Sequence, residues 1–134
     1  MEEVNNSLFQ SIDEENIEVL VREFYHEILE DSLLAPFFID KLGEDIQSKQ
    51  WEEHLLLLIE FWKFVALGYE NYNGSPLQPH FHIKGINTKA FTRWLILFHQ
   101  TVDKFYIPST GEYFKNKSDD IAQNFIRKLN LEGM

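Results

Sequence analysis

The sequence predicts an all-α protein with four main helices and two short ones. Apolar residues recur at helical spacing through four long stretches of the chain. No stretch of useful length alternates between apolar and polar residues as a half-buried strand does. The 134 residues also contain no repeat and no linker-like segment. We therefore expect one domain over residues 1–134, in which residues 1–11 form a flexible N-terminal extension.

The first long helix is expected within residues 11–31. Ser11 and Glu14 have the spacing of a capping box, which marks a helix start. The apolar residues that follow share one helical face: Ile17, Leu20, Val21, Phe24 and Ile28. Pro36 interrupts the pattern, because proline biases the residue before it away from helical backbone angles. We expect a short helical turn over residues 36–42.

The second long helix is predicted over residues 48–69, and its inward stripe contains a histidine. The stripe consists of His54, Leu58, Phe61, Trp62 and Val65. His54 therefore faces the interior beside the largest apolar residues of its helix. The connection that follows is rich in turn residues, and Ser75 before Pro76 predicts the N-cap and first residue of a short helix.

The third long helix is expected to begin at Asn87 or Thr88 and to end at Pro108. Its apolar face consists of Phe91, Trp94, Leu95, Phe98, Val102 and Phe105. The last helix has two candidate starts, a capping box from Ser109 to Glu112 and a later one at Ser118. It is predicted to end near Leu129, and its buried residues are Ile121, Phe125 and Leu129.

The composition excludes several classes of function. A net charge of −10 disfavours nucleic acids and anionic membrane surfaces, because there is no basic excess to bind phosphates. The chain has no cysteine, and its two methionines are the terminal residues Met1 and Met134, so sulfur ligands are not expected. The start MEEVNNSLF has no basic segment typical of a signal peptide, and no apolar run has the length of a membrane span. We expect a cytoplasmic protein.

Aromatic residues are abundant, at 15% of the chain with twelve phenylalanines and three tryptophans. Such side chains pack a core, and they also line pockets for flat apolar ligands. The sequence alone leaves both uses open.

Five histidines are candidates for chemistry. His26 and His99 lie beside or opposite the apolar stripes of their helices, which favours ordinary, partly exposed side chains. His54 faces inward, either as a core histidine with a backbone partner or as a group that points into a cavity. His80 and His82 point about 200° apart if their segment is helical, so they cannot share one ion there. An extended segment would allow it.

Several motifs occur in an order that resembles the truncated haemoglobins, and among them group III. The motifs are Phe24-Tyr25, Pro36-Phe37-Phe38, Trp51-x-x-His54, Phe61-Trp62, Tyr72-Asn73-Gly74-x-Pro76-Leu77-x-x-His80 and Phe91-x-x-Trp94-Leu95 with Phe98. The resemblance covers residues 12–129, and the segment from Tyr72 to His80 is its most specific part. The diglycine motifs of groups I and II are absent, which fits group III.

The resemblance implies a two-over-two helical sandwich around haem b, with His80 as the proximal ligand of the iron. Tyr25, His54 and Trp94 match distal positions, and Phe38 matches the corner phenylalanine that packs on the porphyrin. The residues expected at the haem are Tyr25, Phe38, His54, Leu58, Phe61, Trp62, Leu77, His80, His82, Phe91 and Trp94.

The sequence departs from the family pattern at two positions. Many truncated haemoglobins have a lysine or arginine where this chain has Leu57, and that residue pairs with a haem propionate. Less certain candidates for the propionates are His82, Lys84 and Arg93. Pro79 precedes the proximal position and removes a backbone donor from a short helix, so this segment is expected to be looser or more bent.

The physical chemistry agrees with this interpretation. Without thiolate or internal methionine, histidine is the axial ligand that remains for haem, and without a Cys-x-x-Cys-His motif the haem is non-covalent. A diatomic ligand on the iron gains partial negative charge, which the hydroxyl of Tyr25 and the indole N–H of Trp94 can stabilise as donors.

Three functions stay open at this stage. The first is reversible binding of O2, NO or CO, with oxygen transport as one use, extended to NO dioxygenation or peroxide chemistry if a separate reductase supplies electrons. The second is electron transfer or sensing by a six-coordinate haem with His54 and His80 as ligands. The third is a helical interaction module without cofactor, which predicts a colourless protein.

Overall fold

A computed structural model describes residues 8–69 and 85–129 of the chain. The described residues form five α-helices, α2 (Glu14–Leu29), α3 (Ala35–Leu42), α4 (Lys49–Leu67), α5 (Thr88–Phe105) and α6 (Pro108–Lys128). Backbone pairing outside helices is confined, in these residues, to one isolated bridge between Phe9 and Tyr106. The all-α prediction is confirmed.

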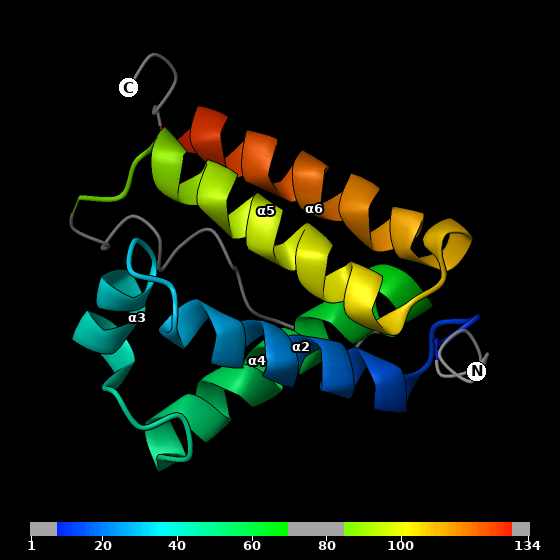
Figure 1. Cartoon of the computed structure of the whole chain (residues 1–134), viewed down its shortest axis with the longest axis horizontal. Coiled ribbons are helices and arrows are strands. Elements are labelled where there is room, and N and C mark those ends of the chain that lie inside the picture. The colour runs from blue at the N-terminus through cyan, green and yellow to red at the C-terminus, as the bar shows by residue number, and fades with distance from the viewer. Residues whose placement is uncertain (1–7, 70–84, 130–134) are drawn as a thin grey trace, which may run out of the picture.

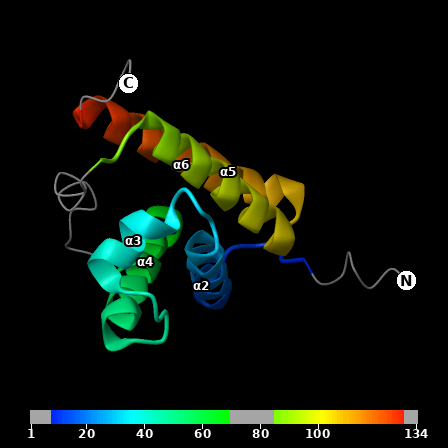
Figure 2. The same ribbon diagram turned by 60° about the vertical axis from the view of Figure 1, so that its left-hand side comes forward.

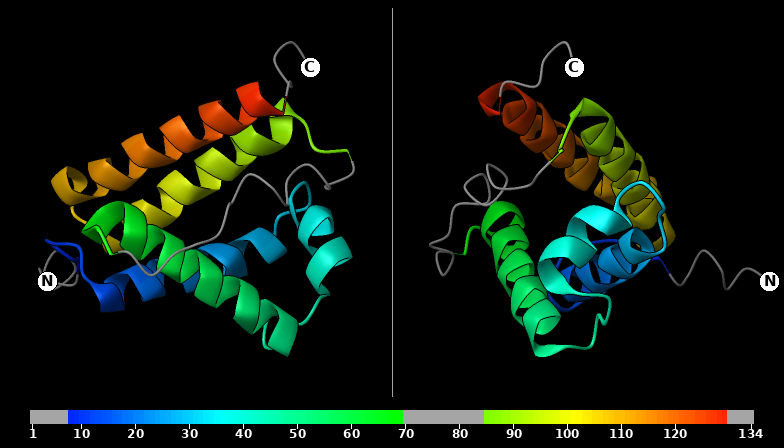
Figure 3. Two further views of the ribbon diagram at one scale, coloured as in Figure 1. Left: turned by 180° about the vertical axis from the view of Figure 1, so that it is seen from behind. Right: turned by 90° about the vertical axis from the view of Figure 1, so that its left-hand side faces the viewer.

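The helices pack in two crossed layers. α5 and α6 run antiparallel and pack against each other along their length, and α2 packs on α5, on α4 and on α3 (Figure 1). Figure 2 shows the α5–α6 pair crossing above α2 and α4. From behind, α4 crosses α2 at a steep angle, and α3 connects the two at one end of the molecule (Figure 3). The arrangement is a two-over-two helical sandwich.

α2 starts two residues later than the sequence pattern indicates. Its N-cap is Asp13, whose carboxylate accepts a hydrogen bond from the backbone N–H of Asn16 at 2.8 Å, while Asn16 Oδ1 accepts from the N–H of Asp13 at 2.9 Å. The expected capping box of Ser11 and Glu14 is therefore wrong. The side chains of Asp13 and Asn16 satisfy the same unpaired N–H groups of the first turn.

Asn16 is also the centre of a buried polar cluster. Its side chain is 3% exposed, donates to the Ser11 carbonyl at 2.9 Å and accepts from the Tyr106 hydroxyl at 2.7 Å. Phe9 pairs with the backbone on either side of Tyr106, since its N–H bonds to Phe105 and its carbonyl accepts from Ile107. The segment before α2 is thereby tied to the corner between α5 and α6.

Both predicted starts of the last helix are wrong, because α6 begins at Pro108. Proline is well tolerated in the first turn of a helix, where its missing N–H would have no partner. Pro108 thus ends the run of α5 and opens α6 after a corner of two residues, Tyr106 and Ile107. Ser118 lies fully buried inside α6, and its hydroxyl donates to the carbonyl of Lys115 at 3.0 Å.

The other helix boundaries agree closely with the sequence pattern. The Ser48 hydroxyl caps α4 by accepting from the N–H of Trp51 at 3.2 Å, and Gly68 ends this helix with a left-handed backbone, φ 75°. The Asn87 side chain caps α5 through the N–H of Ala90 at 2.9 Å. The short helix expected from Ser75 and Pro76 lies outside the described residues.

The main core lies between α2, α4, α5 and α6. Its fully buried members include Ile17, Leu20, Phe24, Ile28, Trp51, Phe98, Val102 and Phe114. The indole N–H of Trp51 donates to the Gly43 carbonyl at 2.8 Å, which fixes the connection between α3 and α4. On the outside, the guanidinium of Arg22 on α2 binds both carboxylate oxygens of Glu52 on α4 at 2.9 Å.

Two neighbouring faces of α4 have different roles. One packs into the core, and the other lines the candidate site. Trp51, Leu55, Ile59 and Trp62 are buried. Three residues of the predicted stripe, His54, Leu58 and Phe61, lie at the edge of that face and are only partly buried. They face a hollow between the two layers. None of the described helices is both long and apolar enough to cross a membrane.

Candidate functional site

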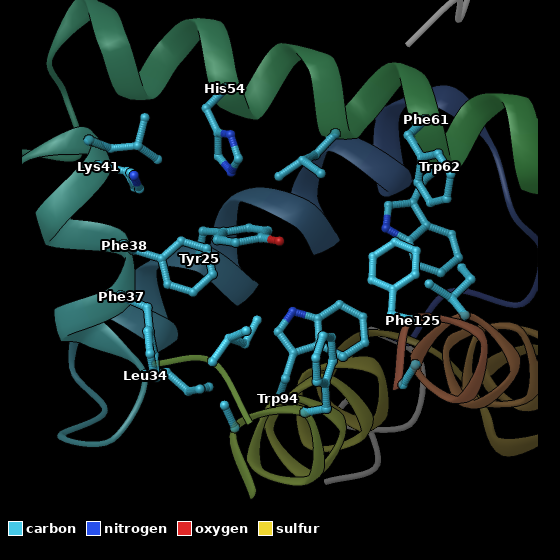
Figure 4. Close-up of a pocket in the computed structure, with 17 residues that line it drawn as sticks. Tyr25, Leu34, Phe37, Phe38, Lys41, His54, Phe61, Trp62, Trp94 and Phe125 are labelled. Atoms are coloured by element: carbon cyan, nitrogen blue, oxygen red, sulfur yellow. The ribbon is translucent and has the colours of Figure 1, made fainter. Parts of the chain in front are cut away.

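An apolar pocket of about 370 Å³ lies between the two helical layers. All five described helices contribute to it, together with Leu34 before α3 and Ile86 before α5. Its lining residues are Tyr25, Leu34, Phe37, Phe38, Lys41, Leu42, His54, Leu58, Phe61, Trp62, Ile86, Ala90, Phe91, Trp94, Ile121, Ala122 and Phe125. The volume lies in the range of sites for small molecules and cofactors, roughly 300–1,000 Å³. Figure 4 shows these side chains converging from α2, α3, α4, α5 and α6.

Tyr25 places a phenol oxygen in the middle of this apolar space (Figure 4). The residue is 7% exposed, and its ring packs edge-on against Phe24, Phe38 and His54. Burial raises the pKa of the phenol well above its usual value, and a hydrogen bond with the Trp94 side chain partly opposes this effect. Tyr25 is therefore a neutral hydroxyl group at ordinary pH.

Trp94 reaches the pocket from α5, in the opposite layer. Its ring stacks on Phe98 with 5.4 Å between the ring centres and 6° between the planes. The indole nitrogen can only donate, so its hydrogen bond with Tyr25 makes the phenol oxygen the acceptor. The hydroxyl proton of Tyr25 can then be donated to a third group in the pocket.

His54 extends from α4 toward Tyr25 (Figure 4). Its imidazole lies edge-on to Tyr25 and to Trp51, with ring centres 5.6 Å apart in both pairs and interplanar angles of 90° and 86°. The ring is half-buried at the pocket wall. Tyr25, His54 and Trp94 thus bring three polar groups from three helices together in a largely apolar space.

Aromatic rings form much of the remaining wall. Phe38 on α3 stacks on Trp51 with ring centres 6.2 Å apart. Phe61 and Trp62 on α4 are in edge contact at 5.5 Å, and Phe91 on α5 is in edge contact with Phe125 on α6 at 6.1 Å. All the predicted pocket positions that lie within the described residues, Tyr25, Phe38, His54, Leu58, Phe61, Trp62, Phe91 and Trp94, do line this space.

The remaining predicted site residues fall elsewhere. Leu77, His80 and His82, with the propionate candidate Lys84, lie outside the described residues. Arg93 does not line the pocket; its guanidinium binds the Asp31 carboxylate at 2.7 Å, and the Asp31 side chain is 8% exposed. Leu57 is 57% exposed.

The ion pair with Arg93 favours the charged form of Asp31. Burial disfavours the charged form of Asp31, but the hydrogen bond from Arg93 and the backbone N–H of Leu34 outweigh it and hold the pKa of Asp31 below its usual value. Arg93 is thereby engaged at the end of α2, which weakens its candidacy as a partner for a ligand carboxylate.

Sequence reasoning missed a second group of lining residues. These are Leu34, Phe37, Lys41, Leu42, Ile86, Ala90, Ile121, Ala122 and Phe125. Ile121 and Phe125 were expected to be buried but not at a pocket, and their spacing of four on α6 is the signal that joins them. Lys41 stands three residues after Phe38 on α3, so both can face the same side of that helix.

The described residues do not build a site for a bare metal ion. Within residues 8–69 and 85–129, no three His, Asp or Glu side chains gather as ligands. The polar groups of the pocket are instead one phenol, two indoles, one imidazole and the ammonium group of Lys41, among apolar side chains. Such a lining suits a flat apolar molecule whose polar centre lies near Tyr25, His54 and Trp94.

Comparison with known proteins gives a sequence relative and a structural neighbour. No family model matches the chain. The group 3 truncated hemoglobin ctb of Campylobacter jejuni subsp. jejuni serotype O:2 is 29% identical over 121 residues, which span 90% of this chain and 94% of that protein. The crystal structure of a group III truncated hemoglobin from Campylobacter jejuni superposes with a TM-score of 0.85, over 91% of this chain and 94% of that chain.

Proposed function

Since the chain is similar to group III truncated haemoglobins in both fold and sequence, we propose that it holds haem b in the pocket between its helical layers. We further propose that a diatomic gas, O2 above all, binds on the side that carries Tyr25, His54 and Trp94. The observation that carries this proposal is the placement of buried donors in an apolar pocket.

The residues of the pocket fit a porphyrin. The lining is almost entirely aromatic and aliphatic, so it can cover the two faces of a flat apolar ring. A core packed for stability alone has no need for the phenol oxygen of Tyr25, because a buried polar atom costs free energy unless it has a partner. The chain has no cysteine, so the group is held without covalent bonds. His80 is our proposal for the axial ligand, on the strength of its motif.

Bound haem supplies an iron atom with a coordination position that accepts a diatomic gas. The protein side of the chemistry is hydrogen bonding. Trp94 donates to the Tyr25 oxygen, which orients the phenol and polarises its O–H bond. Tyr25 would then be the hydrogen-bond donor to the partly negative end of a gas molecule bound there. Because Tyr25 is buried and neutral, its proton is retained over the physiological pH range.

His54 supports a second state of the same site. Its imidazole faces the pocket from α4, and an imidazole that reaches the iron would exclude the gas. The ferrous, ligand-free absorption spectrum separates the two states. We expect one broad visible band, the sign of an open position, which changes when CO or O2 is added. Sharp split bands that persist under the gas would contradict gas binding and favour the six-coordinate alternative.

The axial ligand has its own test with a matched control. We expect His80→Ala to abolish stable haem binding or to change the native spectrum, because the iron loses its protein ligand. His99→Ala is the control, since His99 Nε2 lies 3.0 Å from Asp119 and the residue does not line the pocket. Equal spectra for His80→Ala and the wild type would exclude His80 as the ligand.

A further inference from the structure

Lys41 differs from every other described residue of the pocket lining. It is the sole lysine or arginine among them, and that set contains no aspartate or glutamate. The whole chain, in contrast, has a net charge of −10. The described lining therefore has a positive charge in a strongly acidic protein, which suits a ligand with a negative group.

Lys41 also marks where water reaches the pocket. It is exposed, whereas the other described lining residues are buried or half-buried. Figure 4 places it on α3, beside Phe38 and His54, with Phe61, Trp62 and Phe125 across the pocket. A ligand with one polar edge can lie with that edge toward Lys41 and its apolar body among the aromatic rings, since ionised groups are costly to bury.

Two basic residues on neighbouring helices are already paired, whereas Lys41 forms no ion pair within residues 8–69 and 85–129. Arg93 is bound to Asp31 at 2.7 Å, and Lys63 on α4 lies 3.4 Å from Glu60. Among residues 8–69 and 85–129, no acidic side chain forms an ion pair with Lys41. Its ammonium group can pair with a ligand without breaking an existing contact.

We propose that Lys41 binds a propionate carboxylate of haem, and this inference rests on the haem binding proposed above. In this arrangement, Lys41 on α3 supplies the positive charge for the propionate that Leu57 on α4 lacks. Because the pair lies at an exposed rim, its contribution is modest and depends on ionic strength. It slows the loss of haem more than it determines whether haem binds.

The test measures how fast haem leaves the ferric holoprotein for an excess of a haem-scavenging apoprotein. We expect Lys41→Gln to lose haem about two- to fivefold faster than the wild type at low ionic strength, the size of an exposed ion pair. The difference should shrink in concentrated salt. Lys41→Arg should keep the wild-type rate. Lys49→Gln is the control, because it removes the same charge from an exposed residue outside the pocket lining.

A second arm identifies the group that Lys41 binds. With haem dimethyl ester, whose carboxylates are blocked, the wild type and Lys41→Gln should lose haem at the same rate. If the wild type and Lys41→Gln lost unmodified haem at equal rates, the role of Lys41 would be overturned. The same holds if the ratio of their rates were the same with the ester as with unmodified haem. Either result would leave haem binding intact. A wild-type protein that binds no haem would instead overturn both proposals.

Discussion

At the scale of single residues, the properties of the pocket depend most on Tyr25. Its ring is held among the rings of Phe24, Phe38 and His54, and its hydroxyl group interacts with the side chain of Trp94. A donor held in this way loses little conformational freedom when a ligand arrives, so its hydrogen bond adds directly to the lifetime of the complex.

Replacement of Tyr25 by phenylalanine tests this role. A lost hydrogen bond of about 1–1.5 kcal/mol corresponds to roughly tenfold faster release of O2. Stopped-flow displacement of O2 by CO measures the rate directly. Tyr113→Phe is the control, because its hydroxyl donates to the Val65 carbonyl at 2.7 Å and Tyr113 does not line the pocket. An O2 release rate unchanged in Tyr25→Phe would rule out Tyr25 as the donor.

The same residue affects the pH dependence of folding. Burial raises the pKa of Tyr25 above its ordinary value of 10.0. The folded chain therefore keeps a proton that the unfolded chain releases near pH 10. The unfolded state then binds fewer protons, and the free energy of unfolding falls as pH rises above about 10. We expect Tyr25→Phe to make this fall shallower in urea unfolding between pH 9 and pH 11. Burial also raises the pKa of Tyr106, with a smaller effect from Asp13, so part of the fall should remain. The same slope in wild type and variant would contradict the assignment.

At the scale of helices, the close approach of α5 and α6 depends on Gly111. This glycine is buried in α6, and a Cβ atom added to it would lie 2.9 Å from Cγ1 of Val102 on α5. Val102 is fully buried and branched at Cβ, so it cannot easily rotate away. The helix pair that carries Trp94, Phe91 and Phe125 to the pocket therefore requires a residue without a side chain at this position.

Gly111→Ala should separate the two helices slightly and destabilise the protein. We expect a loss of about 1–3 kcal/mol from overpacking, which exceeds the gain of up to about 1 kcal/mol from the helix propensity of alanine. Urea unfolding of the wild type and of Gly111→Ala measures the net change in the free energy of unfolding. The neighbouring exposed residue offers a control, since Glu112→Ala should change stability by no more than about 0.5 kcal/mol. A more stable Gly111→Ala variant would show that α5 and α6 can move apart without cost.

The helices also show what the sequence could and could not predict. The periodic apolar residues located all four long helices, because each must bury one face. The starts of α2 and α6 were missed for different reasons. Asp13 with Asn16 and Ser11 with Glu14 both suit a capping interaction, and the cap is decided by the contact of Asn16 with Tyr106, which is distant in sequence. Pro108 suits both the end of one helix and the start of the next.

The site was predictable to the extent that its residues belong to a motif. Tyr25, His54 and Trp94 come from three helices, and the family resemblance rather than any local pattern brought them together. Lys41 was missed because it belongs to no motif and the sequence around it carries no signal of a site. Only the folded structure shows that Lys41 is an exposed residue of the described pocket lining.

At the scale of the whole molecule, the pocket is a product of both layers. α2, α3 and α4 supply one wall with Tyr25, Phe38 and His54, and α5 and α6 supply the other with Trp94 and Phe125. Neither layer forms the space by itself. A ligand that fits it binds the folded chain and not the unfolded one, so haem binding and folding stability are coupled.

The most direct test of the account is a titration of the haem-free protein with haemin, followed by its absorbance near the Soret band. We expect a sharp Soret band that grows linearly and stops at one haemin per chain. The absence of such a band, or absorbance that keeps rising without a stoichiometric end point, would contradict the claim that this pocket holds haem.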